Sequence, residues 1–306
     1  MTCAALGMTR AALGLTIGIA FQLGAQDRFE FKELHMGMEV RIVMHSRDEA
    51  LARSAARRAF DRIEALENIM SDYRPESELR RLERRAGEWV PVSAPLFAIL
   101  MLALDVAKKT DGAFDPTAAP VVQLWREARS TSRLPDQRAL DSARALVGWR
   151  RIAIDPRSER VRLAPGTRLD LGGIAKGYIV QAAAREIIVD IPTLVEAGGD
   201  ISVSGVPRGQ AGWTIDVGDS SVVLASGSIS MSGPQTQFVE IGGVRHSHVV
   251  DPRTGMALTS GNFAVVRYGN GAIADALATA LGVMGPEGLA VVRRHFPNAT
   301  ARVGRR

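Results

Sequence analysis

A pair of glycines between an aspartate and a lysine is the first place in this chain where chemistry is expected. In residues 167–180, TRLDLGGIAKGYIV, Asp170 precedes Gly172 and Gly173, and Lys176 follows them. A short strand before the glycines and a helix after them would leave backbone N–H groups and the positive end of the helix dipole at the corner. Such a corner suits a pyrophosphate accompanied by a divalent cation. A tight turn with a solvated lysine is the alternative that the motif leaves open.

A second candidate is an acidic residue in an otherwise apolar helix. Residues 272–284, AIADALATALGVM, are predicted to be helical, with Asp275 and Thr279 one turn apart on the same face. A buried carboxylate needs a partner because an unpaired buried charge is costly. Mg²⁺, which takes oxygen ligands, is one such partner. The alternative is a carboxylate stabilised by the helix dipole, with Thr279 bonding to its own backbone.

A third candidate is a histidine beside a turn. In residues 246–255, HSHVVDPRTG, His248 and Asp251 lie three apart around a turn set by Asp-Pro and Thr-Gly. Both can face one cleft, and a histidine near its ordinary pKa can accept a proton from a hydroxyl. The alternative is that Asp251 caps the turn and His248 is an ordinary half-exposed residue.

Aromatic side chains offer weaker signals. Tyr73, Phe114 and Trp125 are candidates for contact with a flat ring, although aromatic residues more often fill the core. Residues 198–200, Gly-Gly-Asp, form either part of a site or a corner between two strands.

The elements that must position these residues follow from the spacing of apolar side chains. A helix of about five turns is predicted over residues 51–70, where apolar residues recur every three or four positions. Strands are predicted on either side of Met36-Gly37, within residues 29–44. The other expected elements are helices over residues 95–107 and near 121–125, a loop at 130–136, a hairpin at 152–163, and short strands from 193 to 267.

The order of these elements indicates the fold class. Helices come early, strands come late and a helix returns near the end, which favours an α+β fold over alternating βαβ units. No stretch is long enough to separate independent domains, so residues 26–306 are expected to form a single domain.

Composition restricts the partners and the compartment. The net charge is +5, but the arginines are interspersed with acids, which indicates a solvated face and no nucleic-acid partner. Residues 1–25 resemble a signal peptide or an N-terminal anchor, so we expect an exported protein, periplasmic or associated with the outer side of the inner membrane. Cys3, the single cysteine, lies in this segment, which excludes cysteine catalysis in the mature chain.

With these segments identified, the chain resembles the ApbE-type FAD:protein FMN transferase family from Met36 to about Ala290. Seven segments carry the resemblance in the family's order: MGMEVRIVM, MSDYRPESELRRL, GAFDPTAAPVVQLW, LDLGGIAKGY, VEAGGDISVSG, SHVVDPRTG and ADALATAL. The resemblance implies a T-fold-like α+β domain with mixed sheets and packed helices. It also implies Mg²⁺-dependent transfer of the FMN half of FAD to a threonine or serine hydroxyl of a partner protein, with release of AMP.

The resemblance also implies roles for individual residues. It implies contact with FAD at the following positions: Met36, Tyr73, Ala113, Phe114, Asp115, Asp170, Lys176, Val250 and Asp251. It implies that Asp275, Thr279 and the carbonyl of Gly173 hold Mg²⁺. His248 is the expected general base.

One segment departs from the family pattern. The family often reads S-G-D followed by an aromatic residue where this chain has Ser232-Gly233-Pro234-Gln235. The chain has no evident flavin-acceptor motif of its own, so the expected acceptor is a flavoprotein subunit, a membrane or exported redox protein. Two other functions stay open on the sequence alone: an Mg²⁺-dependent FAD pyrophosphatase that gives FMN and AMP, and a non-catalytic flavin-binding protein.

Overall fold

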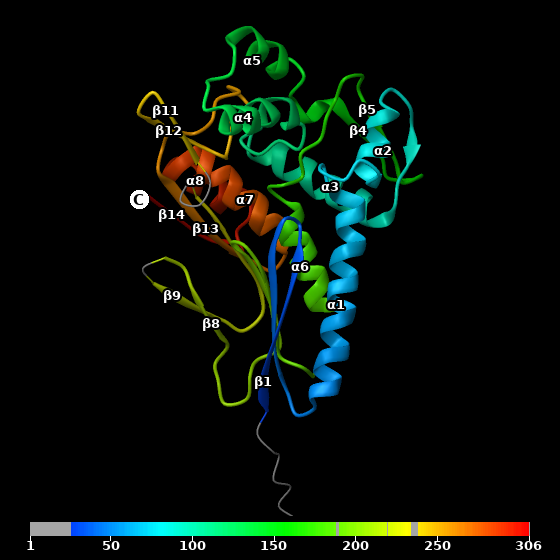
Figure 1. The fold of residues 1–306 in the computed structure, drawn as a ribbon, viewed down its shortest axis with the longest axis vertical. Coiled ribbons are helices and arrows are strands. Elements are labelled where there is room, and N and C mark those ends of the chain that lie inside the picture. Colours follow the sequence, from blue (N-terminus) through cyan, green and yellow to red (C-terminus); the bar gives the residue numbers. More distant parts are fainter. Residues whose placement is uncertain (1–25, 188–189, 219, 234–237, 306) are drawn as a thin grey trace, which may run out of the picture.

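The centre of the molecule is a seven-stranded antiparallel sheet (Figure 1). The computed structural model describes residues 26–187, 190–218, 220–233 and 238–305. The strands of the sheet, in spatial order, are β1 (Asp27–His35), β2 (Met38–Ser46), β6 (Thr193–Ala197), β7 (Asp200–Ser204), β10 (Gly227–Ser232), β13 (Asn262–Tyr268) and β14 (Thr300–Arg305). The expected α+β single domain is confirmed.

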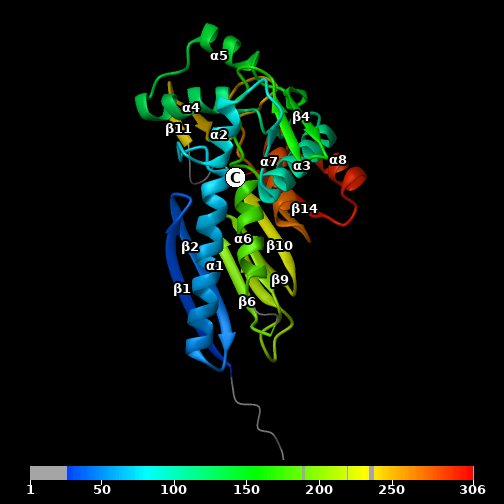
Figure 2. The ribbon, with the colours of Figure 1, turned by 90° about the vertical axis from the view of Figure 1, so that its right-hand side faces the viewer.

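Helices cover one face of this sheet, as Figure 2 shows. α6 packs on β6 and β7, α7 packs on β10 and β13, and α1 packs on α6. The helices are α1 (Glu49–Met70), α2 (Glu78–Arg84), α3 (Ala94–Lys109), α4 (Ala119–Thr131), α5 (Gln137–Arg144), α6 (Ala175–Arg185), α7 (Gly271–Met284) and α8 (Gly288–His295), with 3₁₀ turns η1 (Trp149–Arg151) and η2 (Gly285–Glu287).

The alternation of side chains along β2 explains the two faces. Ile42 and Met44 are fully buried in the core beneath the helices, whereas Val43 points to the opposite face. There it joins Trp213 in a second apolar cluster under the ribbon of β8 (Trp213–Asp216) and β9 (Ser221–Leu224).

Two small sheets lie at the end of the molecule that carries α4 and α5 (Figure 1). One has the order β3 (Val90–Pro91), β5 (Arg160–Leu163) and β4 (Ile152–Asp155), and the other pairs β11 (Phe238–Ile241) with β12 (Val244–Ser247). The predicted hairpin at residues 152–163 is present as β4 and β5. Residues 29–44, predicted to be extended with a break at Met36-Gly37, pair as β1 and β2.

α7 is apolar around most of its circumference because it is buried on most sides. The stretch Gly271–His295 has the length and composition of a membrane span, but 56% of its most apolar window is buried inside the protein. α7 packs against α3 and α6 as well as against the sheet, so this apolar run forms core.

Some local predictions are wrong. Residues 168–171 do not form a strand, because the N–H of Leu169 bonds to the carboxylate of Glu83 and the N–H of Asp170 bonds to the carbonyl of Pro116. α4 continues to Thr131, and α5 and β14 have no counterpart among the predicted elements. Residues 1–25, for which a signal peptide or anchor is predicted, and the departure at Pro234-Gln235 lie outside the described residues.

Candidate active site

The diglycine corner and α7 touch each other directly. A Cβ atom added to Gly173 would lie 2.9 Å from the hydroxyl oxygen of Thr279, closer than real Cβ contacts come. Glycine at this position therefore lets the Thr279 hydroxyl reach the backbone of the corner. One turn further along the chain, a Cβ on Gly177 would lie 2.1 Å from the carbonyl oxygen of Gly271, so α6 and α7 are in backbone contact.

Beside this contact lies a buried cluster of charges. Nζ of Lys176 lies 2.7 Å from Oδ2 of Asp200 and 3.3 Å from the carboxylate of Asp275. The N–H of Gly177 donates to Oδ2 of Asp275 at 3.1 Å, and Oγ of Ser230 donates to Oδ1 of Asp200 at 2.5 Å. Both aspartates are almost completely buried, with exposed fractions of 3% for Asp275 and 2% for Asp200. Lys176 is thus an ion-pair partner in a buried site, so the alternative of a solvated lysine is wrong.

The protonation equilibria of the cluster follow from this arrangement. Burial, reinforced by the nearby negative charge of Asp200, raises the pKa of Asp275 to about 7 in spite of Lys176. Burial also opposes the charge of Lys176, but the two carboxylates outweigh it and raise the pKa of Lys176 above its usual value. One ammonium faces two carboxylates, so this cluster carries an excess negative charge when Asp275 is ionised.

Three oxygen-bearing groups in and beside this cluster are of the kind that binds magnesium. The carboxylate of Asp275, the hydroxyl of Thr279 and the carbonyl of Gly173 are all oxygen donors, which Mg²⁺ prefers. Thr279 and Gly173 are in contact, and Asp275 is one helical turn from Thr279. A cation here would also balance the excess charge of Asp200 and Asp275.

The sequence predicts free backbone N–H groups at the N-terminus of α6, but most of them are already bonded. The N–H groups of Ile174 and Ala175 bond to the carbonyl of Leu171, and the N–H of Gly177 bonds to Asp275. Most of the first-turn donors among these residues are therefore already used by the protein. The positive charge that attracts an anion to this corner would therefore come mainly from Lys176, whose side chain is 27% exposed. The helix terminus would contribute less.

Asp170 belongs to a second cluster, centred on an arginine of α4. Nη1 of Arg126 lies 2.5 Å from Oδ2 of Asp72, and Nη2 lies 3.1 Å from Oδ2 of Asp170. The guanidinium carbon lies 4.6 Å from the centre of the Tyr73 ring, a cation–π distance. Tyr73 is 74% exposed, so one large aromatic ring beside the cluster is accessible to a planar ligand.

The side chains of the turn before α4 bond and pack within the protein. Asp115 is buried and accepts hydrogen bonds from the N–H and hydroxyl of Thr117 and from the N–H of Trp149. Burial raises the pKa of Asp115. Ala113 and Phe114 are in the hydrophobic core, so any contact of these two with a ligand would have to come from the backbone of the turn.

The His248 turn packs on α4. Val250 pairs with Ala257 and lies in an apolar cluster with Trp125, whose indole N–H donates to the carbonyl of Gly255 at 2.9 Å. The Trp125 ring stacks on His246, with centroids 5.0 Å apart, so this aromatic residue is core.

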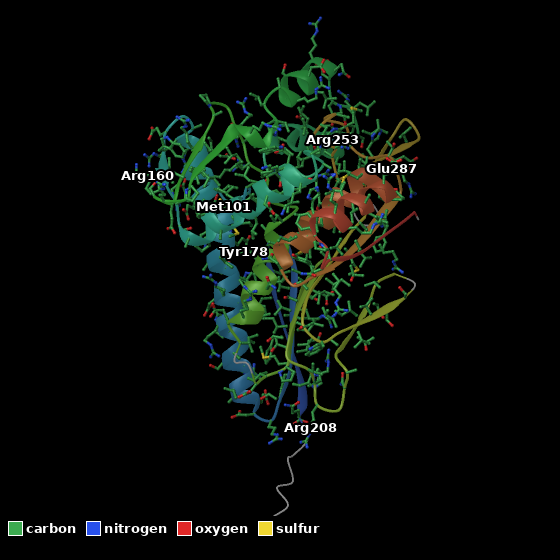
Figure 3. All side chains as sticks on the ribbon, turned by 180° about the vertical axis from the view of Figure 1, so that it is seen from behind. Met101, Arg160, Tyr178, Arg208, Arg253 and Glu287 are labelled. Carbon is green, nitrogen blue, oxygen red and sulfur yellow. The ribbon has the colours of Figure 1, made fainter. Side chains whose placement is uncertain are left out.

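Asp251 accepts bonds from the N–H and guanidinium of Arg253, which Figure 3 shows in the same half of the molecule as α4 and α5. Asp251 therefore caps its own turn, which is the structural alternative considered for it from the sequence. His248 is half-buried at the end of β12.

Met36 lies at the tip of the β1–β2 hairpin. Its φ of 53° and that of Gly37, 73°, place both residues in the left-handed region, as a two-residue hairpin turn requires. Methionine is disfavoured there, and such strain is most often kept where a side chain has a function. The N–H of Met36 donates to Oε2 of Glu67 on α1 at 3.1 Å, which holds the tip against the helix.

α4 connects the parts of the site. Arg126 bonds to the segment that leads into the diglycine corner, and Trp125 bonds to the turn that follows His248. Sequence reasoning missed Arg126 and assigned no role to Asp200 beyond the Gly-Gly-Asp motif. Their partners lie 44 and 24 residues away in the sequence, so no local pattern could have paired them.

Comparisons with known proteins identify the family and the fold. A family model described as the ApbE family matches residues 36–303. The FAD:protein FMN transferase of Treponema pallidum is 30% identical over 297 residues, covering 88% of this chain and 82% of that protein. The FAD:protein FMN transferase of Vibrio cholerae is 32% identical over 246 residues, covering 75% of this chain and 73% of that protein.

Solved structures of ApbE proteins have a similar fold. The crystal structure of the ApbE protein from Thermotoga maritima superposes with a TM-score of 0.83 at 28% identity, covering 91% of this chain and 97% of that one. The apo flavinyl transferase ApbE of Pseudomonas stutzeri superposes with a TM-score of 0.80 at 26% identity, covering 93% of both chains.

Proposed function

Because this chain belongs to the ApbE family, we propose that it is an enzyme, an FAD:protein FMN transferase. Its substrates are FAD and an acceptor protein. In the reaction, a threonine or serine hydroxyl of the acceptor attacks the phosphorus of the FMN half of FAD. The bond from that phosphorus to the bridging oxygen breaks, AMP leaves, and the hydroxyl proton passes to a base.

The observation that carries this proposal is the buried cluster beside the contact of Gly173 with Thr279. Lys176 lies between Asp200 and Asp275, and its partly exposed ammonium can pair with a phosphate oxygen of FAD. Asp275, Thr279 and the Gly173 carbonyl would hold Mg²⁺. When bound, this ion neutralises charge on the pyrophosphate and stabilises the departing AMP.

The remaining residues bind and orient the substrates. The exposed ring of Tyr73, supported from one side by Arg126, offers a face to the flat isoalloxazine or adenine ring. Met36, on the strained hairpin tip, is proposed to line the same cleft. His248 is proposed as the base, because a hydroxyl is a poor nucleophile until its proton is accepted.

A test follows from the products. The chain from residue 26 onward is incubated with FAD, Mg²⁺ and an exported redox-protein subunit, and the gel is inspected for covalent flavin fluorescence. A fluorescent acceptor with a mass gain of one FMN supports the transferase. FMN and AMP without an adduct would indicate a pyrophosphatase, and FAD that persists unchanged would indicate a flavin-binding protein.

The compartment is part of the proposal. The signal-like composition of residues 1–25 supports export, to the periplasm or to the outer side of the inner membrane. The acceptor is then a flavoprotein subunit exposed on the same side.

Replacing His248 by alanine is expected to slow transfer by at least about 100-fold, the usual contribution of a positioned base. FAD affinity, measured by quenching of flavin fluorescence, should change only a few-fold because the imidazole acts on the acceptor hydroxyl. His295→Ala, at an exposed histidine of α8, is the matched control and should keep the parent rate. A His248→Ala variant with the parent rate would remove this residue from the mechanism.

A further inference from the structure

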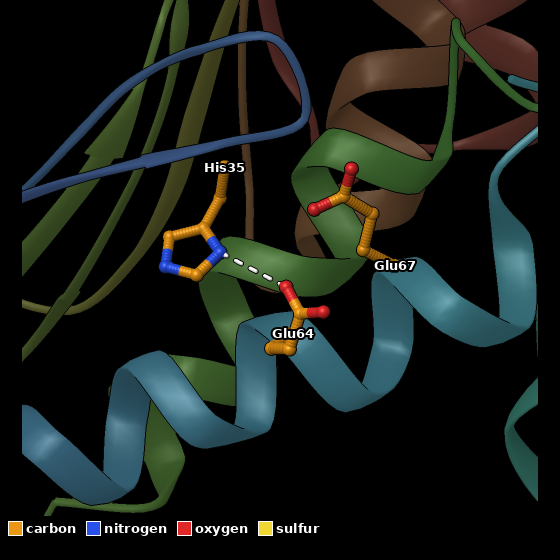
Figure 4. A group of neighbouring side chains, drawn as sticks. All are labelled: His35, Glu64 and Glu67. Carbon is orange, nitrogen blue, oxygen red and sulfur yellow. Dashed lines mark ion pairs between the residues drawn. The ribbon is translucent and has the colours of Figure 1, made fainter. Parts of the chain in front are cut away.

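A second group of potential metal ligands lies where the β1–β2 hairpin meets α1 (Figure 4). His35 comes from the end of β1, and Glu64 and Glu67 lie one turn apart on α1. One ligand atom from each of the three residues lies within 4.8 Å of the others. Ligand atoms of a single zinc ion are about 3–4 Å apart, so small side-chain rotations would bring the three into coordination.

The imidazole of His35 is held with one nitrogen directed into this group. Its side chain is only 10% exposed, and the ring stacks on Phe60 with centroids 5.7 Å apart. Nε2 lies 3.1 Å from Oε2 of Glu33, which accepts a hydrogen bond only if Nε2 carries the proton. In the neutral imidazole, Nδ1 then presents a lone pair.

No hydrogen-bond donor in the part of the chain that the structure describes reaches that lone pair. Nδ1 of His35 is buried and has no hydrogen-bond partner among the described residues, and it faces Oε2 of Glu64 at 3.5 Å. A lone pair against a carboxylate is unfavourable unless a proton or a metal ion lies between them. A carboxylate that orients the far nitrogen of a histidine is also a common feature around metal-bound imidazoles.

The charges of the neighbouring side chains also favour a bound cation. Arg74 pairs with both Glu64 and Glu67, and Arg57 pairs with both Glu33 and Asp61. Among the described side chains joined in this way, two guanidinium groups face four carboxylates. With a neutral His35 the group has two excess negative charges, which a divalent cation would balance.

We propose that His35, Glu64 and Glu67 form a binding site for a divalent transition-metal ion, such as Zn²⁺ or Mn²⁺. One imidazole nitrogen with two carboxylates suits these ions, whereas Mg²⁺ prefers oxygen ligands alone. Glu64 is 46% exposed and provides the side from which an ion can enter. Each carboxylate can keep its bond to Arg74 while another lone pair coordinates the ion.

The position of the site gives it a structural role. An ion bound there joins the hairpin tip to the last turns of α1. Met36 directly follows His35, and Tyr73 lies shortly after the end of α1. The ion would therefore fix the spacing of two segments that we assign to the flavin cleft. The metal site itself does not rest on the proposed function.

The test is a zinc titration of the chain from residue 26 onward by calorimetry, with excess Mg²⁺ to occupy the other site. We expect one saturable Zn²⁺ site and a higher melting temperature with zinc. Outer partners of metal ligands usually contribute about 10–100-fold to affinity, so loss of a direct ligand in His35→Gln should weaken binding by at least about 100-fold. Glu64→Gln/Glu67→Gln should have the same effect.

Two controls separate the site from other causes. His295→Gln removes an exposed histidine, and Asp275→Ala removes a proposed magnesium ligand; both should bind zinc as the parent does. Circular dichroism without metal checks that each variant is folded. Equal zinc affinity of His35→Gln and the parent would overturn the proposal. So would nitrogen NMR showing a His35 ring protonated at both nitrogens and unchanged by zinc.

Discussion

Replacing Asp275 by alanine is expected to reduce FMN transfer by at least about 100-fold, because the proposed magnesium site loses its only carboxylate ligand and a bound metal contributes several kcal/mol to such a transition state. The fold should remain intact. Asp275 is one of two carboxylates that face a single ammonium, so its removal leaves Lys176 paired with Asp200 in a neutral cluster. FAD should still bind, because the proposed contacts with the flavin lie elsewhere.

The measurement compares initial rates of acceptor labelling with FAD affinity and melting temperature. Asp275→Asn keeps an acceptor for the N–H of Gly177 but removes the charge, so it should lose transfer as the alanine variant does. Asp216→Ala, at an exposed aspartate of β8, is the control for removal of a carboxylate in general. Transfer at the parent rate in Asp275→Ala would exclude this residue from the site.

Replacing Gly177 by alanine is expected to destabilise the protein by about 2–3 kcal/mol, since the added methyl group overpacks a core contact. The new Cβ would lie 2.1 Å from the carbonyl oxygen of Gly271 and 2.8 Å from Cβ of Asp275. The first of these is backbone and cannot rotate away, so α6 and α7 must move apart. The melting temperature should fall by about 5–10 °C, and transfer should fall with it because Gly173 and Thr279 separate.

Gly269→Ala is the matched control for this variant. Gly269 has ordinary backbone angles and nothing within 4 Å of an added Cβ, so this change should have little effect on stability. An unchanged melting temperature in Gly177→Ala would mean that the two helices are not held in backbone contact in solution.

Local patterns predicted a large part of the fold. The spacing of apolar residues predicted α1, and Asp48, whose side chain accepts from the N–H of Leu51, gives that helix a defined start. The break predicted at Met36-Gly37 is the turn of the first hairpin, because two residues with positive φ can join antiparallel strands without a loop. These elements depend on residues close in the sequence.

The errors came from long-range contacts. Residues 168–171 have the alternation of a strand but bond to Glu83 and Pro116, which no local pattern can reveal. The same limitation affects the site. Asp275 was recognised as a buried carboxylate in need of a partner, but its pairing with Lys176 and its proximity to Asp200 depend on the packing of α6, α7 and the sheet.

The roles assigned to individual residues stay predictions, and the structure divides them into two kinds. Lys176, Gly173, Asp275 and Thr279 lie together, as one site requires. Asp115 and Asp251 instead use their carboxylates to bind nearby backbone and side-chain donors, and Asp115 also accepts from the N–H of Trp149, so both shape the backbone around α4.

The direction of β1 determines how far the candidate site lies from Asp27. β1 begins at Asp27, at the end of the molecule opposite α4 and α5, and runs nine residues toward the hairpin tip. At about 3.4 Å per residue this is a rise of about 30 Å. Should residues 1–25 stay attached as a lipid-embedded tether, the end with the candidate site would be held well above the bilayer surface. An acceptor in the same membrane would then need to present its target hydroxyl on a projecting domain.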